Sequence, residues 1–198
     1  MNISDTSTDE DDRYHITNLY TSIEGTILCS TLSSFSFLAS IAIIIIIQRS
    51  HDGLGSVYHR FLCCMSIGNL AAAISMSFNT LLMPSDMPYY TGFEGLHIGN
   101  QTTCNIQGFM FTFGVAFEVS YFVMLLVYYC CVITLRMRND TIRRYIEPVL
   151  HVIALSVGLA HSVPSVLWDL INPLVDKNWC SRSVLPFWCV DEPDTCIR

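Results

Sequence analysis

Hydrophobic residues gather into four long stretches that polar segments separate. The stretches cover Gly25–Ile47, Phe61–Met83, Cys104–Leu135 and Val149–Ile171. A helix needs about 20 mostly apolar residues to cross a bilayer, and each stretch reaches that length. The pattern therefore predicts an all-α membrane protein with four transmembrane helices.

Composition agrees with a helix bundle in a lipid bilayer. Of 198 residues, 52% are hydrophobic and 14% are charged, whereas soluble domains carry about 25% charged residues. The net charge of −7 disfavours a nucleic-acid partner. We expect one membrane domain over residues 25–172, preceded by an acidic tail (1–24) and followed by a Cys-rich segment (173–198).

The charges of the connections predict which way the bundle crosses the membrane. Basic residues near span ends favour the cytoplasmic side. The second connection (84–103) has no Lys or Arg, whereas the first and third carry Arg49, Arg60, Arg136, Arg138, Arg143 and Arg144. We therefore expect the first and third connections in the cytoplasm. The N-terminus, the second connection and the C-terminal segment should lie outside, in the plasma membrane or another endomembrane.

Three glycosylation sequons bear on this orientation. Asn2 lies in the tail and Asn100 in the second connection, both on the expected outer side, where a glycan is added to Asn-x-Ser/Thr. Asn139 lies in the third connection and should stay unmodified.

Nine cysteines divide between two environments. Five lie within the apolar stretches, where Cys packs as a small hydrophobe, namely Cys29, Cys63, Cys64, Cys130 and Cys131. Four lie on the expected outer side, where disulfides form, namely Cys104, Cys180, Cys189 and Cys196. Four cysteines allow three pairings, and their spacing does not indicate a zinc site.

Several short motifs occur in a characteristic order. The third stretch opens with Thr103-Cys104-Asn105-Ile106-Gln107-Gly108-Phe109 and closes with Tyr128-Tyr129-Cys130-Cys131-Val132-Ile133. Glu147-Pro148 opens the fourth stretch, and Asn178-Trp179-Cys180 follows it. Over about residues 60–190 this order resembles the G-protein-coupled receptors, in particular the cyclic-AMP-receptor-like and related receptor-like proteins of microbial eukaryotes.

The resemblance implies a disulfide between Cys104 and Cys180 and leaves Cys189 and Cys196 to form a second pair. It also implies an extracellular ligand and a heterotrimeric G protein that contacts the arginines of the first and third connections. Such receptors have seven spans, so we expect this chain to be a truncated or partial form. The acidic residue, Arg and Tyr that end the third span in rhodopsin-like receptors are not found around Arg136.

Polar residues within the apolar stretches are further candidates for function. Glu118 lies about 21 Å into the third stretch, at 1.5 Å per helical residue. A charged carboxylate at that depth is costly, so we expect Glu118 to face the bundle interior. Its expected neighbours are Asn69, Ser75 or Asn79 of the second stretch and His161 of the fourth. Asn69 is flanked by small residues, which favours a hydrogen bond across helices.

The sequence contains no recognisable catalytic motif, phosphate-binding loop or metal-ligand spacing, so we expect a protein that is not an enzyme and needs no cofactor. The alternative to a receptor-like protein is a genuine four-span scaffold or a channel or transporter subunit. Tetraspan families usually place both termini in the cytoplasm, whereas both termini are expected outside here.

Overall fold

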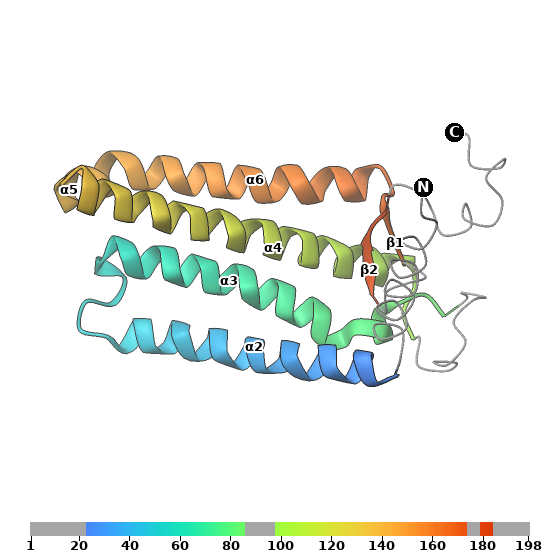
Figure 1. The fold of residues 1–198 in the computed structure, drawn as a ribbon. Coiled ribbons are helices and arrows are strands. Elements are labelled where there is room, and N and C mark those ends of the chain that lie inside the picture. Colours follow the sequence, from blue (N-terminus) through green and yellow to red (C-terminus); the bar gives the residue numbers. More distant parts are fainter. Residues whose placement is uncertain (1–22, 86–97, 174–178, 184–198) are drawn as a thin grey trace, which may run out of the picture.

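Four long helices make up the body of the protein in the computed structural model (Figure 1), which describes residues 23–85, 98–173 and 179–183. The helices are α2 (Ile23–Arg49), α3 (Val57–Phe78), α4 (Gln101–Tyr129) and α6 (Glu147–Leu167). Each belongs to a span that is long and apolar enough to cross a membrane. The predicted all-α architecture with four membrane helices is confirmed.

The helices lie side by side in the order α2, α3, α4 and α6 (Figure 1), and each packs against its neighbour in that row. Successive helices run in opposite directions, so alternate connections meet at the same end. We call the end that carries residues 50–60 and 135–147 the arginine-rich end. The opposite end, formed by residues 79–85, 98–107, 168–173 and 179–183, is the disulfide end.

Short elements close both ends. At the arginine-rich end these are η1 (Gly53–Gly55), the π-helix η3 (Cys130–Thr134), α5 (Asn139–Thr141) and the π-helix η4 (Ile142–Ile146). At the disulfide end they are η2 (Asn79–Leu82), β1 (Ile171–Pro173) and β2 (Cys180–Arg182). The two strands pair antiparallel, with Ile171 opposite Arg182.

Two buried clusters and one close helix contact hold the bundle together. The cluster toward the arginine-rich end contains Val57, Phe61, Tyr121, Met124, Cys131, Ile142, Leu150 and Ala154. The cluster at the disulfide end contains Met83, Cys104, Ile171 and Cys180. Between them α3 and α4 touch so closely that a Cβ added to Gly114 would lie 2.7 Å from the backbone nitrogen of Ala72. Glycine permits such backbone contact between membrane helices.

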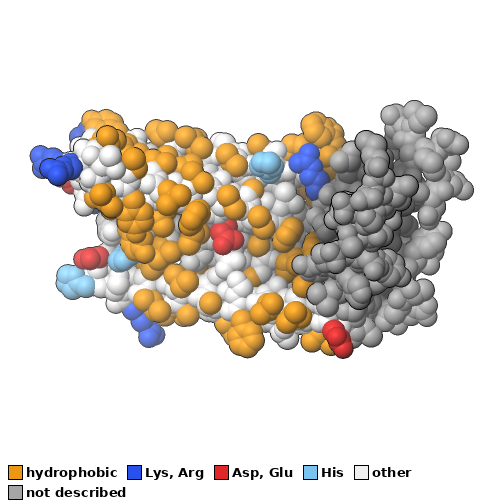
Figure 2. Space-filling view, viewed as in Figure 1, with side chains coloured by type: hydrophobic (Ala, Val, Ile, Leu, Met, Phe, Trp, Pro, Cys, Tyr) orange, Lys and Arg blue, Asp and Glu red, His pale blue; other side chains and the backbone are white. Residues whose placement is uncertain are grey.

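The outer surface of the helices is apolar. Large hydrophobic side chains are widely exposed, among them Phe35 at 71% and Val152 at 65%. Figure 2 shows hydrophobic side chains along the length of the bundle, with arginine or lysine side chains toward its ends. Monomeric soluble proteins rarely expose apolar area of this extent, whereas lipid chains would cover it. The surface therefore fits a multi-pass membrane protein.

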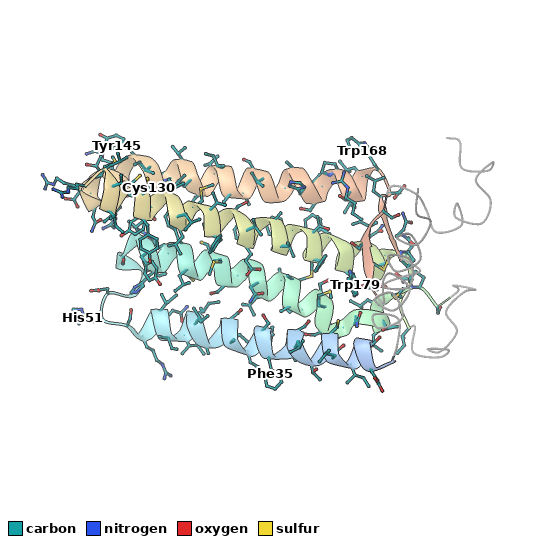
Figure 3. All side chains as sticks on the ribbon, in the orientation of Figure 1. Phe35, His51, Cys130, Tyr145, Trp168 and Trp179 are labelled. Atoms are coloured by element: carbon teal, nitrogen blue, oxygen red, sulfur yellow. A yellow bond between two sulfur atoms is a disulfide. The ribbon has the colours of Figure 1, made fainter. Side chains whose placement is uncertain are left out.

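Exposed aromatic side chains mark both ends of the helices. Trp168 lies at the disulfide end and is 69% exposed, and Tyr145 lies at the arginine-rich end and is 63% exposed (Figure 3). Tyr and Trp concentrate where a membrane meets water. The two residues thus fit the two boundaries of the hydrocarbon layer.

The ends of the spans differ from the predicted ones. The fourth apolar stretch was expected at 149–171, whereas the helical segment covers Asn139–Leu167. Asp169 takes a left-handed φ of 50°, which ends the helical part and turns the chain into β1. The third span begins at Gln101 rather than Cys104, because the Asn100 side chain caps the first turn of α4.

Candidate functional site

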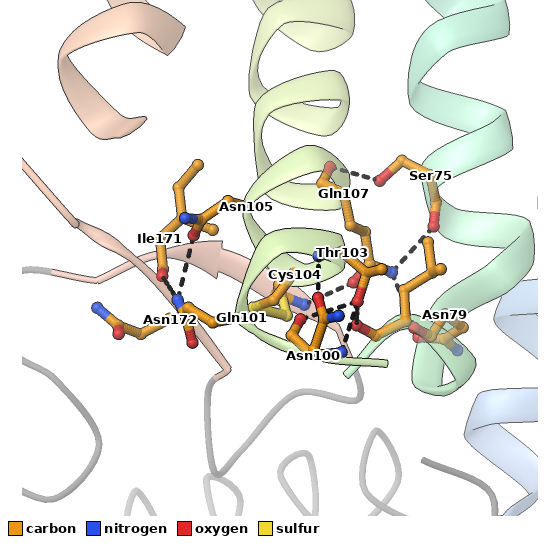
Figure 4. Close-up of a disulfide and its surroundings, with 12 residues drawn as sticks. Ser75, Asn79, Asn100, Gln101, Thr103, Cys104, Asn105, Gln107, Ile171 and Asn172 are labelled. Carbon is orange, nitrogen blue, oxygen red and sulfur yellow. Dashed lines mark hydrogen bonds between the residues drawn. A yellow bond between two sulfur atoms is a disulfide. The ribbon is translucent and has the colours of Figure 1, made fainter. Parts of the chain in front are cut away.

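A covalent bond ties the disulfide end together. Cys104 of α4 and Cys180 of β2 form a disulfide, with their Cα atoms 5.4 Å apart and both side chains fully buried. The pairing implied by the receptor resemblance is confirmed. Because β2 follows α6 in the chain, the bond fixes the segment that leaves α6 against the start of α4 (Figure 4). The predictions for Asn2, Cys189 and Cys196 lie outside the described residues.

Gln107 is the polar centre of the disulfide end, and no role was predicted for it. Its side chain is 1% exposed. The amide Nε2 donates to the backbone oxygens of Asn79 at 2.8 Å and Ser75 at 3.1 Å. The amide Oε1 accepts from the backbone nitrogen of Cys180 at 3.2 Å (Figure 4). One buried side chain therefore links α3, α4 and β2 next to the disulfide.

The spacing of Gln107 and Cys104 is the sequence signal that could have identified this group. Residues three apart in a helix lie on the same face, so Cys104 and Gln107 both point toward the strand that holds Cys180. A buried amide with unused donors is costly, which indicates that a Gln at this position needs several partners.

Asn100 is exposed at this end and uses only part of its side chain in the helix cap. Its Oδ1 accepts a hydrogen bond from the Thr103 backbone nitrogen at 2.9 Å. A glycan would attach to the other atom of the amide, Nδ2, and would leave the cap bond in place. Glycosylation of Asn100 remains a prediction.

A buried ion pair joins α3 to α6 at the arginine-rich end. The Arg60 guanidinium approaches the Glu147 carboxylate in two places, with Nε 2.6 Å from Oε1 and Nη2 2.8 Å from Oε2. The Glu147 side chain is 6% exposed and that of Arg60 is 24% exposed. The Nη2 contact is a charge-assisted hydrogen bond, which is stronger than a bond between neutral groups, whereas the Nε approach is an ion-pair contact without hydrogen-bond geometry.

The ion pair continues into a chain of polar contacts across three helices. His151 of α6 lies one turn after Glu147, and its Nε2 is 3.5 Å from the Glu147 Oε1. Its Nδ1 lies 2.7 Å from the hydroxyl oxygen of Tyr121 in α4. Phe61 of α3 packs beside both rings, at 5.3 Å from His151 and 6.2 Å from Tyr121 between centroids. We call Arg60, Glu147, His151 and Tyr121 the polar chain.

The polar chain is an ion-pair and hydrogen-bond network. Among the residues that the structure describes, no three His, Cys, Asp or Glu side chains gather closely enough to hold a metal ion. Because its members come from α3, α4 and α6, their contacts depend on how these three helices are arranged.

The arginines predicted to contact a cytoplasmic partner fall into two groups. Arg60 is partly buried in the bundle, where its charge is paired with that of Glu147. The two residues lie 87 positions apart in the chain. The others are exposed, namely Arg49, Arg136, Arg138, Arg143 and Arg144. Arg138 lies 3.7 Å from the exposed Asp140, a pair that solvent weakens. Exposed positive charge therefore remains at this end.

A polar hollow opens beside the polar chain at the arginine-rich end. Its volume is about 410 Å³, and its lining includes Asp52, Ser56, Tyr128, Asn139 and Arg143. Ser56 lies one helical turn before Arg60, and Arg143 lies one turn before Glu147. The hollow therefore adjoins the ion pair on the side that faces away from the membrane centre.

Glu118 is placed differently from the expectation. It is half-buried in α4, where its backbone nitrogen lies against Gly68 of α3. Its carboxylate has no hydrogen bond or ion pair to any residue that the structure describes. His161 is exposed on α6 and makes no contact of this kind with Glu118.

The other expected partners of Glu118 bond elsewhere. Asn69 donates to Ser36 at 2.9 Å and to Ser40 at 2.8 Å, both in α2. Ser75 donates to the backbone oxygen of Gln107 at 2.9 Å. Asn79 donates to the backbone oxygen of Thr26, also in α2, at 3.5 Å. The hydrogen bond across helices that Asn69 was expected to make is formed, but it joins α3 to α2.

No protein-family model, curated protein or solved structure matches this chain. The resemblance to G-protein-coupled receptors remains a prediction from the order of the sequence motifs.

Proposed function

We propose that this chain is a receptor-like transmembrane signalling protein that corresponds to the first four helices of a G-protein-coupled-receptor bundle. The observation that carries the proposal is the Cys104–Cys180 disulfide, which joins the start of the third span to the chain after the fourth. Disulfides persist on the outer side of a membrane, and arginine-rich connections favour the cytoplasmic side. The disulfide end thus faces outward in this proposal, and the arginine-rich end faces inward.

The outer end is suited to pass movement to α4. An extracellular ligand that displaces β2 pulls on Cys104 through the disulfide and on Gln107 through the Cys180 nitrogen. Both residues lie in the first turns of α4. Because α4 is continuous as far as Tyr121, a shift or rotation at Cys104 is carried about 26 Å along the helix.

The arginine-rich end is suited to respond to a movement of α4. Tyr121 bonds His151, which neighbours the Arg60–Glu147 pair between α3 and α6. A movement of α4 that breaks the Tyr121–His151 bond removes one of the contacts that orient the pair. The exposed arginines and the hollow of about 410 Å³ then form the surface that a heterotrimeric G protein contacts.

Nucleotide exchange on a G protein tests the proposal without a known ligand. The chain is placed in lipid nanodiscs with a purified heterotrimeric G protein, and binding of a non-hydrolysable GTP analogue is followed over time. We expect Glu147→Gln to raise the basal exchange rate severalfold, because Arg60 is released from α6. Glu24→Gln, at the exposed start of α2, should leave the rate unchanged.

The same preparations separate the rival function. Ion or solute flux across proteoliposomes, together with exchange rates that no variant changes, would favour a channel or transporter subunit and overturn the receptor-like proposal.

A further inference from the structure

Tyr145 begins a row of exposed side chains along the outer side of α6. Tyr145, Val149 and Val152 are 63%, 56% and 65% exposed, and their spacing of four and three residues places them on one side of a helix. The opposite side of this segment packs into the bundle through Ile142 and Leu150. Because α6 ends the row of helices and packs against α4 (Figure 1), lipid chains would cover Val149 and Val152 in a membrane.

The row starts at the depth of the lipid headgroups. Tyr145 and Trp168 are exposed aromatic residues toward the two ends of this helical segment (Figure 3), 23 positions apart in the chain. This separation spans about 34 Å at 1.5 Å per helical residue, slightly more than the hydrocarbon core of about 30 Å. The Tyr145 ring therefore reaches the boundary of the hydrocarbon core, and Arg144, one residue earlier, lies level with the lipid phosphates.

Arg144 carries a positive charge that is available at this depth. Its guanidinium carbon lies 5.6 Å from the centre of the Tyr145 ring, a distance at which a cation and an aromatic face attract each other. The side chain is exposed and forms no ion pair with any residue that the structure describes. Arg138, in contrast, lies near Asp140. Arg144 can therefore bind an anion at the membrane surface, with Tyr145 beside it.

We propose that Arg144 and Tyr145 form a binding site for one anionic phospholipid of the leaflet at the arginine-rich end. A guanidinium presents several N–H donors in a plane that matches the oxygens of a phosphate, and the Tyr145 hydroxyl can donate one more hydrogen bond. The acyl chains of the same lipid lie along Val149 and Val152. A lipid with a net negative headgroup fits better than phosphatidylcholine, because arginine repels the choline cation.

The surrounding charge favours the same ligand. From position 136 to position 146 the chain carries four arginines and one acidic residue, Asp140, and Figure 2 shows basic side chains gathered at this end. Basic clusters next to a membrane span attract anionic lipids. Arg143 lines the polar hollow, whereas Arg144 lies against Tyr145 at the lipid-facing row. The proposal does not depend on the receptor-like function, since a scaffold or channel subunit would present the same side chains to lipid.

The test measures lipid binding to the full chain in neutral detergent micelles by native mass spectrometry. Dioleoylphosphatidylglycerol is titrated, and the fraction of protein that carries one lipid gives an apparent dissociation constant. Dioleoylphosphatidylcholine has the same chains and a phosphate, so the comparison isolates the charge of the headgroup. We expect phosphatidylglycerol to bind more tightly, and Arg144→Gln to weaken its binding about fivefold, the effect of one arginine near an anionic lipid. Arg144→Lys, which keeps the charge, should lose less.

Arg143→Gln and Arg182→Gln are matched controls, because they remove exposed arginines beside the hollow and at the disulfide end. Each should change the dissociation constant much less than Arg144→Gln does. Excess inorganic phosphate at constant ionic strength should not displace the lipid, because the acyl chains contribute to binding. Retention of the Cys104–Cys180 disulfide verifies that each variant is folded. Equal affinity for the two lipids, equal losses for the Arg143 and Arg144 variants, or displacement by inorganic phosphate would overturn the proposal.

Discussion

The Arg60–Glu147 ion pair should make a large and measurable contribution to the stability of the bundle. At an effective dielectric constant of about 20, opposite unit charges about 3 Å apart attract each other by about 5 kcal/mol. Desolvation of both groups offsets much of this attraction. Removal of one partner is different, because the remaining charge stays buried without compensation, at a cost of about 3–5 kcal/mol.

The exposed fractions predict which single variant is worse. Arg60→Met leaves the Glu147 carboxylate, 6% exposed, whereas Glu147→Gln leaves the Arg60 guanidinium, 24% exposed. Since the carboxylate is less accessible to water, we expect Arg60→Met to lower the free energy of unfolding more than Glu147→Gln. The double variant should be more stable than the sum of the two losses predicts, with a coupling energy of about 2 kcal/mol.

The assay is a double-mutant cycle on the protein in mixed micelles, unfolded by increasing fractions of sodium dodecyl sulfate and followed by circular dichroism. The matched control is Arg138 with Asp140, an ion pair at the same end whose side chains are 85% and 89% exposed. Its coupling energy should be near zero, because solvent screens such pairs. Equal coupling energies for the two pairs would refute the interpretation of Arg60–Glu147 as a buried tie between α3 and α6.

Three further substitutions test other contacts. Gln107→Leu should destabilise the disulfide end by about 2–3 kcal/mol, because buried donor and acceptor groups lose their partners. Dithiothreitol should then reduce the Cys104–Cys180 bond faster, and an unchanged reduction rate would contradict the role given to Gln107. Gly114→Val should prevent folding because a Cβ there would overlap α3, whereas Gly55→Ala, with open space around it, should not. Tyr121→Phe should cost about 1 kcal/mol through loss of the bond to His151, and an unaltered unfolding curve would show that the bond contributes nothing.

The sequence predicted the helices well because bilayer thickness sets a length that a hydropathy pattern records directly. It predicted their ends less well, because ends depend on single residues. The cap at Asn100 and the left-handed backbone of Asp169 move two boundaries by several residues, and neither residue type is restricted to such positions.

The site was predicted only in part, since it depends on how each helix is rotated. Cys104–Cys180 followed from the resemblance to a receptor family. The Arg60–Glu147 pair did not follow from any spacing, because its members lie 87 residues apart. Glu118 was recognised as unusual by its depth, but its direction is set by the contact of Gly68 with α4, which a pattern of hydrophobic residues does not reveal.

The orientation of the bundle is the claim on which the functional assignments depend, and glycosylation mapping tests it most directly. The chain is synthesised with microsomes, and variants that keep only the Asn100 sequon or only the Asn139 sequon are compared by their shift on treatment with an endoglycosidase. If the disulfide end faces outward, Asn100 at that end carries a glycan and Asn139 at the arginine-rich end does not. A glycan on Asn139 with none on Asn100 would place the arginine-rich end outside and contradict the proposed orientation.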